Sequence, residues 1–211
     1  MNKMIEVDVS KIQMLDAYKL LIGTVVPRPI AWVGSIGKSG SVNLAPFSFF
    51  TAVCSNPPSL LFCPANHPDG KEKDTLRNIR ETRCFTVNLA NEALAREMNQ
   101  TAANYPPEVN EFKEAGLTAA PSRKIKAPRV GESPASFECE LLDVVAVGPG
   151  GSGSGHIVLG KVVYAHYSEQ VYEDGKIKIE ELKPIARLGG TSYCRVNDIF
   201  ELARPKLGPT S

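Results

Sequence analysis

Short apolar and β-branched segments, separated by turns that contain glycine or proline, are the feature of this sequence that most restricts its fold. The chain has 17 glycines and 16 prolines, and both residue types interrupt regular structure and favour turns. Many short strands at nearly regular spacing, with helices inserted among them instead of alternating with them, are typical of a β-barrel with added helices. We therefore predict a mostly β fold with peripheral helices.

The individual strands are predicted from alternating or continuous apolar runs. They are expected at residues 5–9, 30–36, 42–45, 48–55, 59–63, 84–89, 136–147 and 156–166. The Gly-Lys-Ser-Gly run at 37–40 predicts a hairpin loop, and the Asp-Gly pair at 174–175 predicts a second hairpin. Helices are expected at 12–21, 74–81 and 92–100, and Asp74 is expected to cap the second of them.

Residues 101–135 are rich in proline, lysine and alanine and show little periodicity. We expect them to form a long surface excursion with one helical turn within 109–115. No internal repeat and no convincing linker divides the sequence. The chain is therefore expected to form one domain over residues 1–211.

Charge and composition argue against several classes of protein. Lys plus Arg number 24 and Asp plus Glu number 23, a formal net charge of +1, which argues against binding to nucleic acid through phosphate neutralisation. No apolar run approaches the ~20 residues of a membrane span, and residues 1–13 contain no apolar signal segment. The five cysteines are too scattered for a disulfide framework or a zinc site. We expect a cytoplasmic protein that binds no metal, nucleic acid or membrane.

Two glycine-containing runs imitate phosphate-binding motifs. The Gly-Lys-Ser run at 37–39 lacks the glycine that a P-loop requires at position 32, which is Trp32, and a strand is predicted after it. Residues 148–153 match the spacing of a dinucleotide-binding loop, but a strand is predicted after them where that fold needs a helix. We interpret both runs as loops.

Four places in the sequence could carry chemistry. Arg28 lies between two prolines, so its guanidinium is either aimed at an anion or solvated on a rigid connection. The segment 43–51 has a proline within a strand pattern, which marks an edge or bulge that could hold a flat ring, although its aromatic residues also suit a core. Residues 71–75 precede a helix and suit either a phosphate or a solvated cap. His156 follows a glycine-rich loop and is either functional or hydrogen-bonded to that loop.

Taken together and in order, several segments resemble the flavin reductase-like family, whose members are similar to flavoredoxin. The segments are PRPIAWV at 27–33, NLAPFSFFTAVCSNPPSLLF at 43–62, KDTLRNI at 73–79, FTVNL at 85–89, FECEL at 137–141, GHIVLGKVV at 155–163 and PIARLGGTSYCRV at 184–196. Each segment is a weak signal alone, but the ordered set is specific and covers most of the chain.

The resemblance implies an FMN-binding split β-barrel that forms a homodimer, with FMN preferred to FAD and held near the subunit interface. It also implies hydride transfer from NADH or NADPH, or electron transfer between FMN and an acceptor. Carried over by position, the cofactor-binding residues along the isoalloxazine are Asn43, Ala45, Ser48, Phe49 and Phe50. Those that serve the phosphate are Arg28, Lys73 and Thr75, and His156 faces the flavin or the nicotinamide as the catalytic residue.

Some alternatives remain open at this point. Residues 67–72 lengthen the approach to the phosphate segment, so either Lys71 or Lys73 could reach the phosphate. A non-catalytic flavin-binding or flavin-storage protein would show the same barrel and phosphate site. An enzyme of the pyridoxamine-phosphate oxidase type is disfavoured, because the basic substrate-binding set of that family has no counterpart here.

Overall fold

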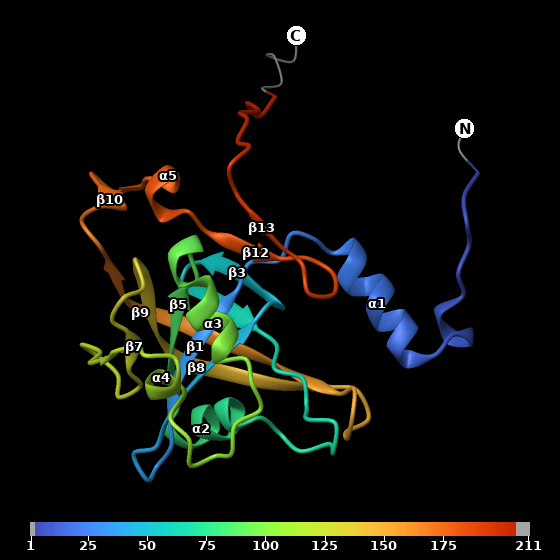
Figure 1. The fold of residues 1–211 in the computed structure, drawn as a ribbon, viewed down its shortest axis with the longest axis horizontal. Coiled ribbons are helices and arrows are strands. Elements are labelled where there is room, and N and C mark those ends of the chain that lie inside the picture. Colours follow the sequence, from blue (N-terminus) through green and yellow to red (C-terminus); the bar gives the residue numbers. More distant parts are fainter. Residues whose placement is uncertain (1–2, 206–211) are drawn as a thin grey trace.

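A seven-stranded antiparallel sheet forms the centre of the molecule. The computed structural model describes residues 3–205, and Figure 1 shows the strands of this sheet at the centre, with the helices around them. The strand order is β2-β1-β5-β8-β9-β4-β3. The bounds are β1 (Ala31–Ile36), β2 (Val42–Phe47), β3 (Phe50–Ser55), β4 (Pro58–Phe62), β5 (Cys84–Leu89), β8 (Ala135–Val147) and β9 (Gly155–Tyr167). The prediction of a mostly β fold is confirmed.

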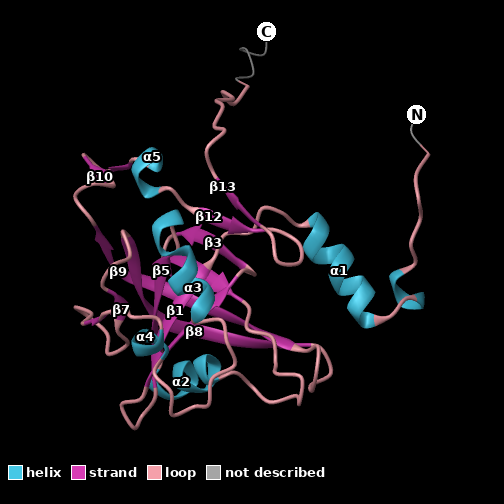
Figure 2. Cartoon of the chain, in the orientation of Figure 1, coloured by secondary structure: helices cyan, strands magenta, loops and turns pink. Residues whose placement is uncertain are grey.

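Three short two-stranded sheets and several helices surround this sheet, as Figure 2 shows by colour. The short pairs are β6 (Ala119–Ala120) with β7 (Arg129–Val130), β10 (Tyr172–Glu173) with β11 (Lys176–Ile177), and β12 (Ile185–Arg187) with β13 (Tyr193–Arg195). The helices are α1 (Met14–Thr24), α2 (Asp74–Thr82), α3 (Ala95–Gln100), α4 (Glu111–Glu114) and α5 (Ile179–Leu182), with 3-10 turns η1 (Val9–Lys11) and η2 (Glu92–Leu94). Within residues 3–205, no helix has the length and apolar character needed to cross a membrane.

Both predicted hairpins are confirmed. β1 pairs with β2 across the 37–41 turn, where Gly40 adopts a φ of 88° that favours glycine. In the β10–β11 hairpin, Asp174 and Gly175 have φ values of 48° and 81°. Positive φ at both central residues defines the primed turn that matches the twist of two adjoining strands.

The core has two main parts, one on each face of β1. Ala31 and Val33 point into a cluster with Phe62, Phe85 and the α2 residues Leu76 and Ile79. Ile30 and Trp32 belong to a second cluster, whose other members include Leu44, Met98, Phe112 and Val130. Because both faces of β1 are buried, its sequence is continuously apolar instead of alternating. Strand β2 contributes Leu44 to the second cluster and is itself an end strand of the sheet.

Two predictions near the helices were wrong. Residues 5–9 are exposed and form no strand; instead the Asp8 side chain accepts a hydrogen bond from the Ser10 amide and caps the η1 turn. Asp74 does not cap α2, because it is the first residue inside the helix and its carboxylate pairs with Arg77 at 2.6 Å. The N-cap position is Lys73, whose side chain makes no capping hydrogen bond.

The segment 101–135 differs from the predicted surface excursion. It contains α4, which confirms the expected helical turn, and also β6 and β7. Phe112, Leu117 and Val130 are buried in the second core cluster. A segment without periodicity can still supply core residues, because single anchors separated by turns leave no repeating pattern.

Candidate functional site

Strand β2 is an end strand of the main sheet, so one of its edges has no strand partner. This agrees with the interpretation of the proline at position 46, since proline is confined to edges and bulges of sheets. Two clefts adjoin along β2 and share Pro46 and Ala102 in their linings. We call them the α2 cleft, at the N-terminal end of helix α2, and the Arg28 cleft.

The α2 cleft has a volume of about 90 Å³ and is lined by polar side chains from distant parts of the chain. Lys73 Nζ lies 3.3 Å from His67 Nδ1 and donates a hydrogen bond to Asn104 Oδ1 at 3.1 Å. Partial burial lowers the pKa of Lys73. Lys71 does not line this cleft; it is exposed and its Nζ pairs with Asp69 at 3.0 Å. Of the two lysines, the structure therefore brings only Lys73 to the cleft.

A buried network fixes the wall of the α2 cleft. In the amide orientation that satisfies all partners, Asn43 donates to Glu111 Oε1 at 3.1 Å and accepts from Thr75 Oγ1 at 2.9 Å. Glu111 Oε2 also accepts from the Leu44 amide at 3.1 Å. Burial raises the pKa of Glu111. Sequence reasoning missed Glu111, because it lies in the aperiodic 101–135 segment and no motif marks it.

The Arg28 cleft has a volume of about 290 Å³ and is lined by residues of β2, α1, α3 and the β12–β13 turn, among them Pro46, Ser48, Tyr18, Asn99 and Gly190. Arg28 is buried, and its guanidinium lies 5.8 Å from the centre of the Phe49 ring, which is partly exposed. Ala45 lines the neighbouring α2 cleft. Phe50 instead packs against the first core cluster. Asn43, Ala45 and Ser48 therefore lie along the two clefts, whereas Phe50 is partly buried against the first core cluster.

The guanidinium of Arg28 is largely occupied by the protein itself. It donates to the carbonyl oxygens of Ile22 and Val25 at 2.7 and 2.8 Å, to Leu188 O at 2.9 Å and to Ser48 Oγ at 3.3 Å. These bonds use four of the five N–H donors of an arginine. Arg28 therefore holds the C-terminal end of α1 against the β12–β13 turn, with one donor left for another group.

His156 lies beside the approach to α2 and lines neither cleft. Its Nε2 is 3.4 Å from Glu72 Oε1, and Glu72 also pairs with Arg80. The imidazole is nine-tenths buried, and its Nδ1 has no hydrogen-bond partner among residues 3–205. The structure thus places His156 next to the residue that precedes Lys73 and apart from β2.

The assembled site is suited to an elongated anion with a flat apolar part. Backbone N–H groups at the start of α2, together with Lys73 and Thr75, favour a negative charge, whereas the Asp74 and Glu111 carboxylates that line the same cleft oppose it. The β2 edge offers backbone groups and partly exposed aromatic surface. Residues 3–205 contain no group of three or more His, Cys, Asp or Glu side chains arranged to hold a metal ion.

Comparison with known proteins places these features in a family. Residues 22–181 match the family described as flavin reductase like domain. The structure is similar to that of nitrilotriacetate monooxygenase component B from Bacillus cereus, with a TM-score of 0.92 and 38% identity over 96% of this chain and 100% of that chain. It is also similar to 2-nitrobenzoate 2-nitroreductase NbaA from Pseudomonas fluorescens, with a TM-score of 0.86 and 29% identity over 98% and 99% of the two chains.

A more distant structure bears on the fold alone. A Shewanella frigidimarina protein described as having a split barrel domain is 21% identical over 93% of this chain and 96% of that chain, with a TM-score of 0.80. The prediction of a split β-barrel is confirmed by this likeness together with the seven-stranded antiparallel sheet.

Proposed function

The chain belongs to the flavin reductase-like family, and from this premise we propose that it is an FMN-dependent oxidoreductase that takes hydride from NADH or NADPH and passes electrons to an acceptor. A reduced nicotinamide is a cytoplasmic cosubstrate, so the proposal includes a cytoplasmic location. When bound, FMN would supply the hydride and electron chemistry. The observation that carries the proposal is the pair of adjoining clefts along the β2 edge, with a cation and a helix N-terminus at one end.

Lys73, Thr75 and the first turn of α2 would hold the phosphate. Lys73 is half-buried, is hydrogen-bonded to His67 and Asn104, and forms no ion pair within residues 3–205, so its charge is available to an anion. The Asn43 amide fixes the Thr75 hydroxyl. Arg28 would add its one remaining donor, and its larger role is to keep Ser48 and α1 in place.

The ring would lie along β2 between the two clefts. Asn43, Ala45 and Ser48 come from this strand and its end, and Phe49 adds partly exposed flat surface. Phe50, the first residue of β3, would instead pack against the first core cluster. Backbone N–H and C=O groups at an unpaired edge can hydrogen-bond a heteroaromatic ring without adding charge.

His156 would act as a positioning residue at the phosphate end, through Glu72, because its Nδ1 is buried and its Nε2 lies beside the Glu72 carboxylate. No general base is needed for a hydride transferred directly between two rings. The His156→Ala variant should slow flavin reduction while FMN affinity and folding stay nearly unchanged. A collapse of FMN binding would instead make His156 a cofactor ligand, and unchanged kinetics would remove it from the site.

Lysine variants test the phosphate assignment. Lys73→Ala should weaken FMN binding about tenfold or more and riboflavin binding much less, because riboflavin has no phosphate. Lys71→Ala is the matched control, since Lys71 is exposed and paired with Asp69, and it should change neither affinity. Fluorescence titration with both flavins gives the four affinities. Equal losses of FMN and riboflavin in Lys73→Ala would contradict the assignment.

Anaerobic reduction distinguishes the enzyme from a flavin-storage protein. NADH or NADPH added to the FMN-loaded protein without oxygen should bleach the visible absorbance of the flavin within seconds to minutes. The two similar proteins have different names, a monooxygenase component and a nitroreductase, so the electron acceptor is left open in this proposal. A stable, unbleached flavin with either nucleotide would favour storage.

A further inference from the structure

A third and larger cleft lies at the opposite end of helix α2 from Lys73. It has a volume of about 740 Å³ and is bounded by the β1–β2 hairpin, the end of α2, the loop at 122–128 and strand β8. In Figure 1 the hairpin lies near α2 at the lower side of the sheet. The nine residues of α2 separate this cleft from the α2 cleft by about 13 Å along the helix axis.

Positive charge dominates this cleft, which we call the basic cleft. Its cationic side chains come from three separate elements: Lys38 from the hairpin, Arg83 from the end of α2, and Lys124 and Lys126 from the loop. None of the four forms an ion pair with another residue of the described range 3–205. The carboxylates of the lining are Glu81 and Glu140, so positive charges exceed negative ones by two.

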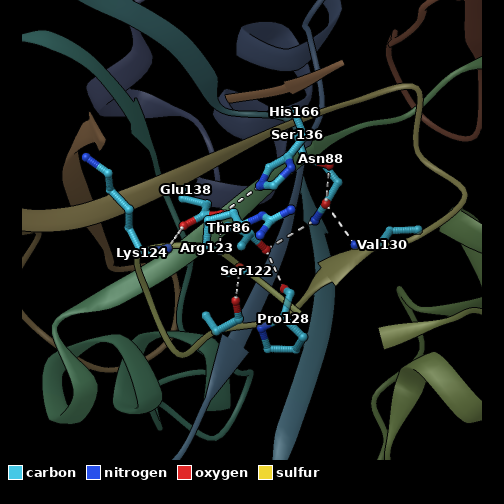
Figure 3. Close-up of polar contacts among 11 residues, drawn as sticks. Thr86, Asn88, Ser122, Arg123, Lys124, Pro128, Val130, Ser136, Glu138 and His166 are labelled. Atoms are coloured by element: carbon cyan, nitrogen blue, oxygen red, sulfur yellow. Dashed lines mark hydrogen bonds and ion pairs between the residues drawn. The ribbon is translucent and has the colours of Figure 1, made fainter. Parts of the chain in front are cut away.

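The loop that carries the two lysines is held by a buried carboxylate. Figure 3 shows Glu138 of β8 accepting hydrogen bonds from the Arg123 and Lys124 amides, at 2.6 and 2.7 Å. Glu138 is fully buried. Farther along the loop, Thr86 Oγ1 donates to Pro128 O at 2.7 Å. The loop backbone is therefore fixed in the folded protein, so a ligand would not have to order it on binding.

Part of the lining is apolar. Ile36, Ile125 and Leu141 contribute to the same cleft as the four cations. Its volume falls within the roughly 300–1,000 Å³ of small-molecule sites. Lysine and arginine side chains form charge-assisted hydrogen bonds with phosphate oxygens. We propose that the basic cleft binds a phosphorylated small molecule of about mononucleotide size, at a site separate from the flavin.

AMP is the probe for this proposal, and adenosine and inorganic phosphate are the comparison ligands. Isothermal titration of the full-length protein, with and without excess FMN, should give a Kd for AMP below about 1 mM. Adenosine and inorganic phosphate should each bind at least about tenfold more weakly, because adenosine lacks the phosphate and inorganic phosphate lacks the nucleoside. The AMP affinity should fall as salt is added, and it should be the same with and without FMN.

Charge reversal at the loop lysines locates the site. Lys124→Glu with Lys126→Glu should reduce the AMP affinity by about tenfold or more and leave FMN binding unchanged. Lys176→Glu, in the separate β10–β11 hairpin, is the control with the same change of charge per residue and should bind AMP normally. Unfolding curves of the variants check that the fold is intact.

Three results would overturn the proposal: AMP binding no tighter than adenosine, AMP affinity unchanged in the loop variant, or competition between AMP and FMN. The first removes the phosphate site, and the second places binding elsewhere. The third would assign AMP to the flavin site. Failure of the protein to bind FMN would contradict the proposed function and leave this test intact, since AMP is also titrated without FMN.

Discussion

Glu138 is a fully buried carboxylate that accepts three hydrogen bonds, from the amides of Arg123 and Lys124 and from Nε2 of His166. Burial alone would raise the pKa of Glu138, but the hydrogen bonds from Arg123, His166 and Lys124 outweigh burial and hold the pKa below its usual value. A carboxyl group with a lowered pKa in the folded state stabilises the protein above its unfolded pKa, and this contribution is lost as the pH falls through the folded pKa.

Glu138→Gln should therefore lower the free energy of unfolding by about 1–3 kcal/mol at pH 7. The side-chain NH₂ of glutamine is a donor, and it would face one of the N–H donors that the carboxylate now accepts from. The loss should shrink as the pH falls through the lowered pKa of Glu138, because the wild-type carboxyl then becomes protonated. Urea unfolding at several pH values measures both effects. Glu140→Gln, on the same strand but exposed, is the control. A loss at Glu138 that is independent of pH would contradict the ionised carboxylate.

At the scale of elements, the segment 101–135 makes the clearest prediction. Phe112 of α4 is 1% exposed and packs in the cluster that contains Trp32, Leu44 and Met98. Phe112→Ala should cost about 3–5 kcal/mol, the range for removing a large buried aromatic side chain. Its neighbour Lys113 is exposed, so Lys113→Ala should cost little. Denaturant unfolding of the two variants measures both costs. If 101–135 were a surface excursion, Phe112→Ala would be as neutral as Lys113→Ala.

The same segment shows what could not be predicted from the sequence, in contrast to the main strands. Strand β5 was predicted with its observed bounds, and β1, β3, β4, β8 and β9 within two residues, because periodicity and turn residues act locally. The false strand at 5–9 has a comparable local pattern but no neighbouring strand to pair with. Glu111 reaches the candidate site only through the tertiary position of α4. Long-range contacts of this kind leave no repeating signal in the sequence.

At the scale of the whole molecule, two apolar segments have little cover within one chain. Helix α1 has no buried residue, and Leu15, Leu20 and Leu21 on it are about half exposed. In the C-terminal tail, Phe200 and Leu202 are more exposed still. Figure 1 shows that both segments extend away from the main sheet. Exposed apolar surface of this extent favours association, as in the homodimer that the family resemblance implies.

Arg28 links this surface to the candidate flavin site, because it holds the last turn of α1 and also contacts Ser48 beside β2. If a second copy covers α1, Leu15→Glu with Leu21→Glu should place two charges in the interface and shift the protein to monomer, with weaker FMN binding. Lys19→Ala on the same helix, an exposed residue, should stay dimeric. Light scattering after size-exclusion chromatography gives the mass, and fluorescence titration gives the FMN affinity. A monomeric unmodified protein that binds FMN tightly would show that one chain completes the site.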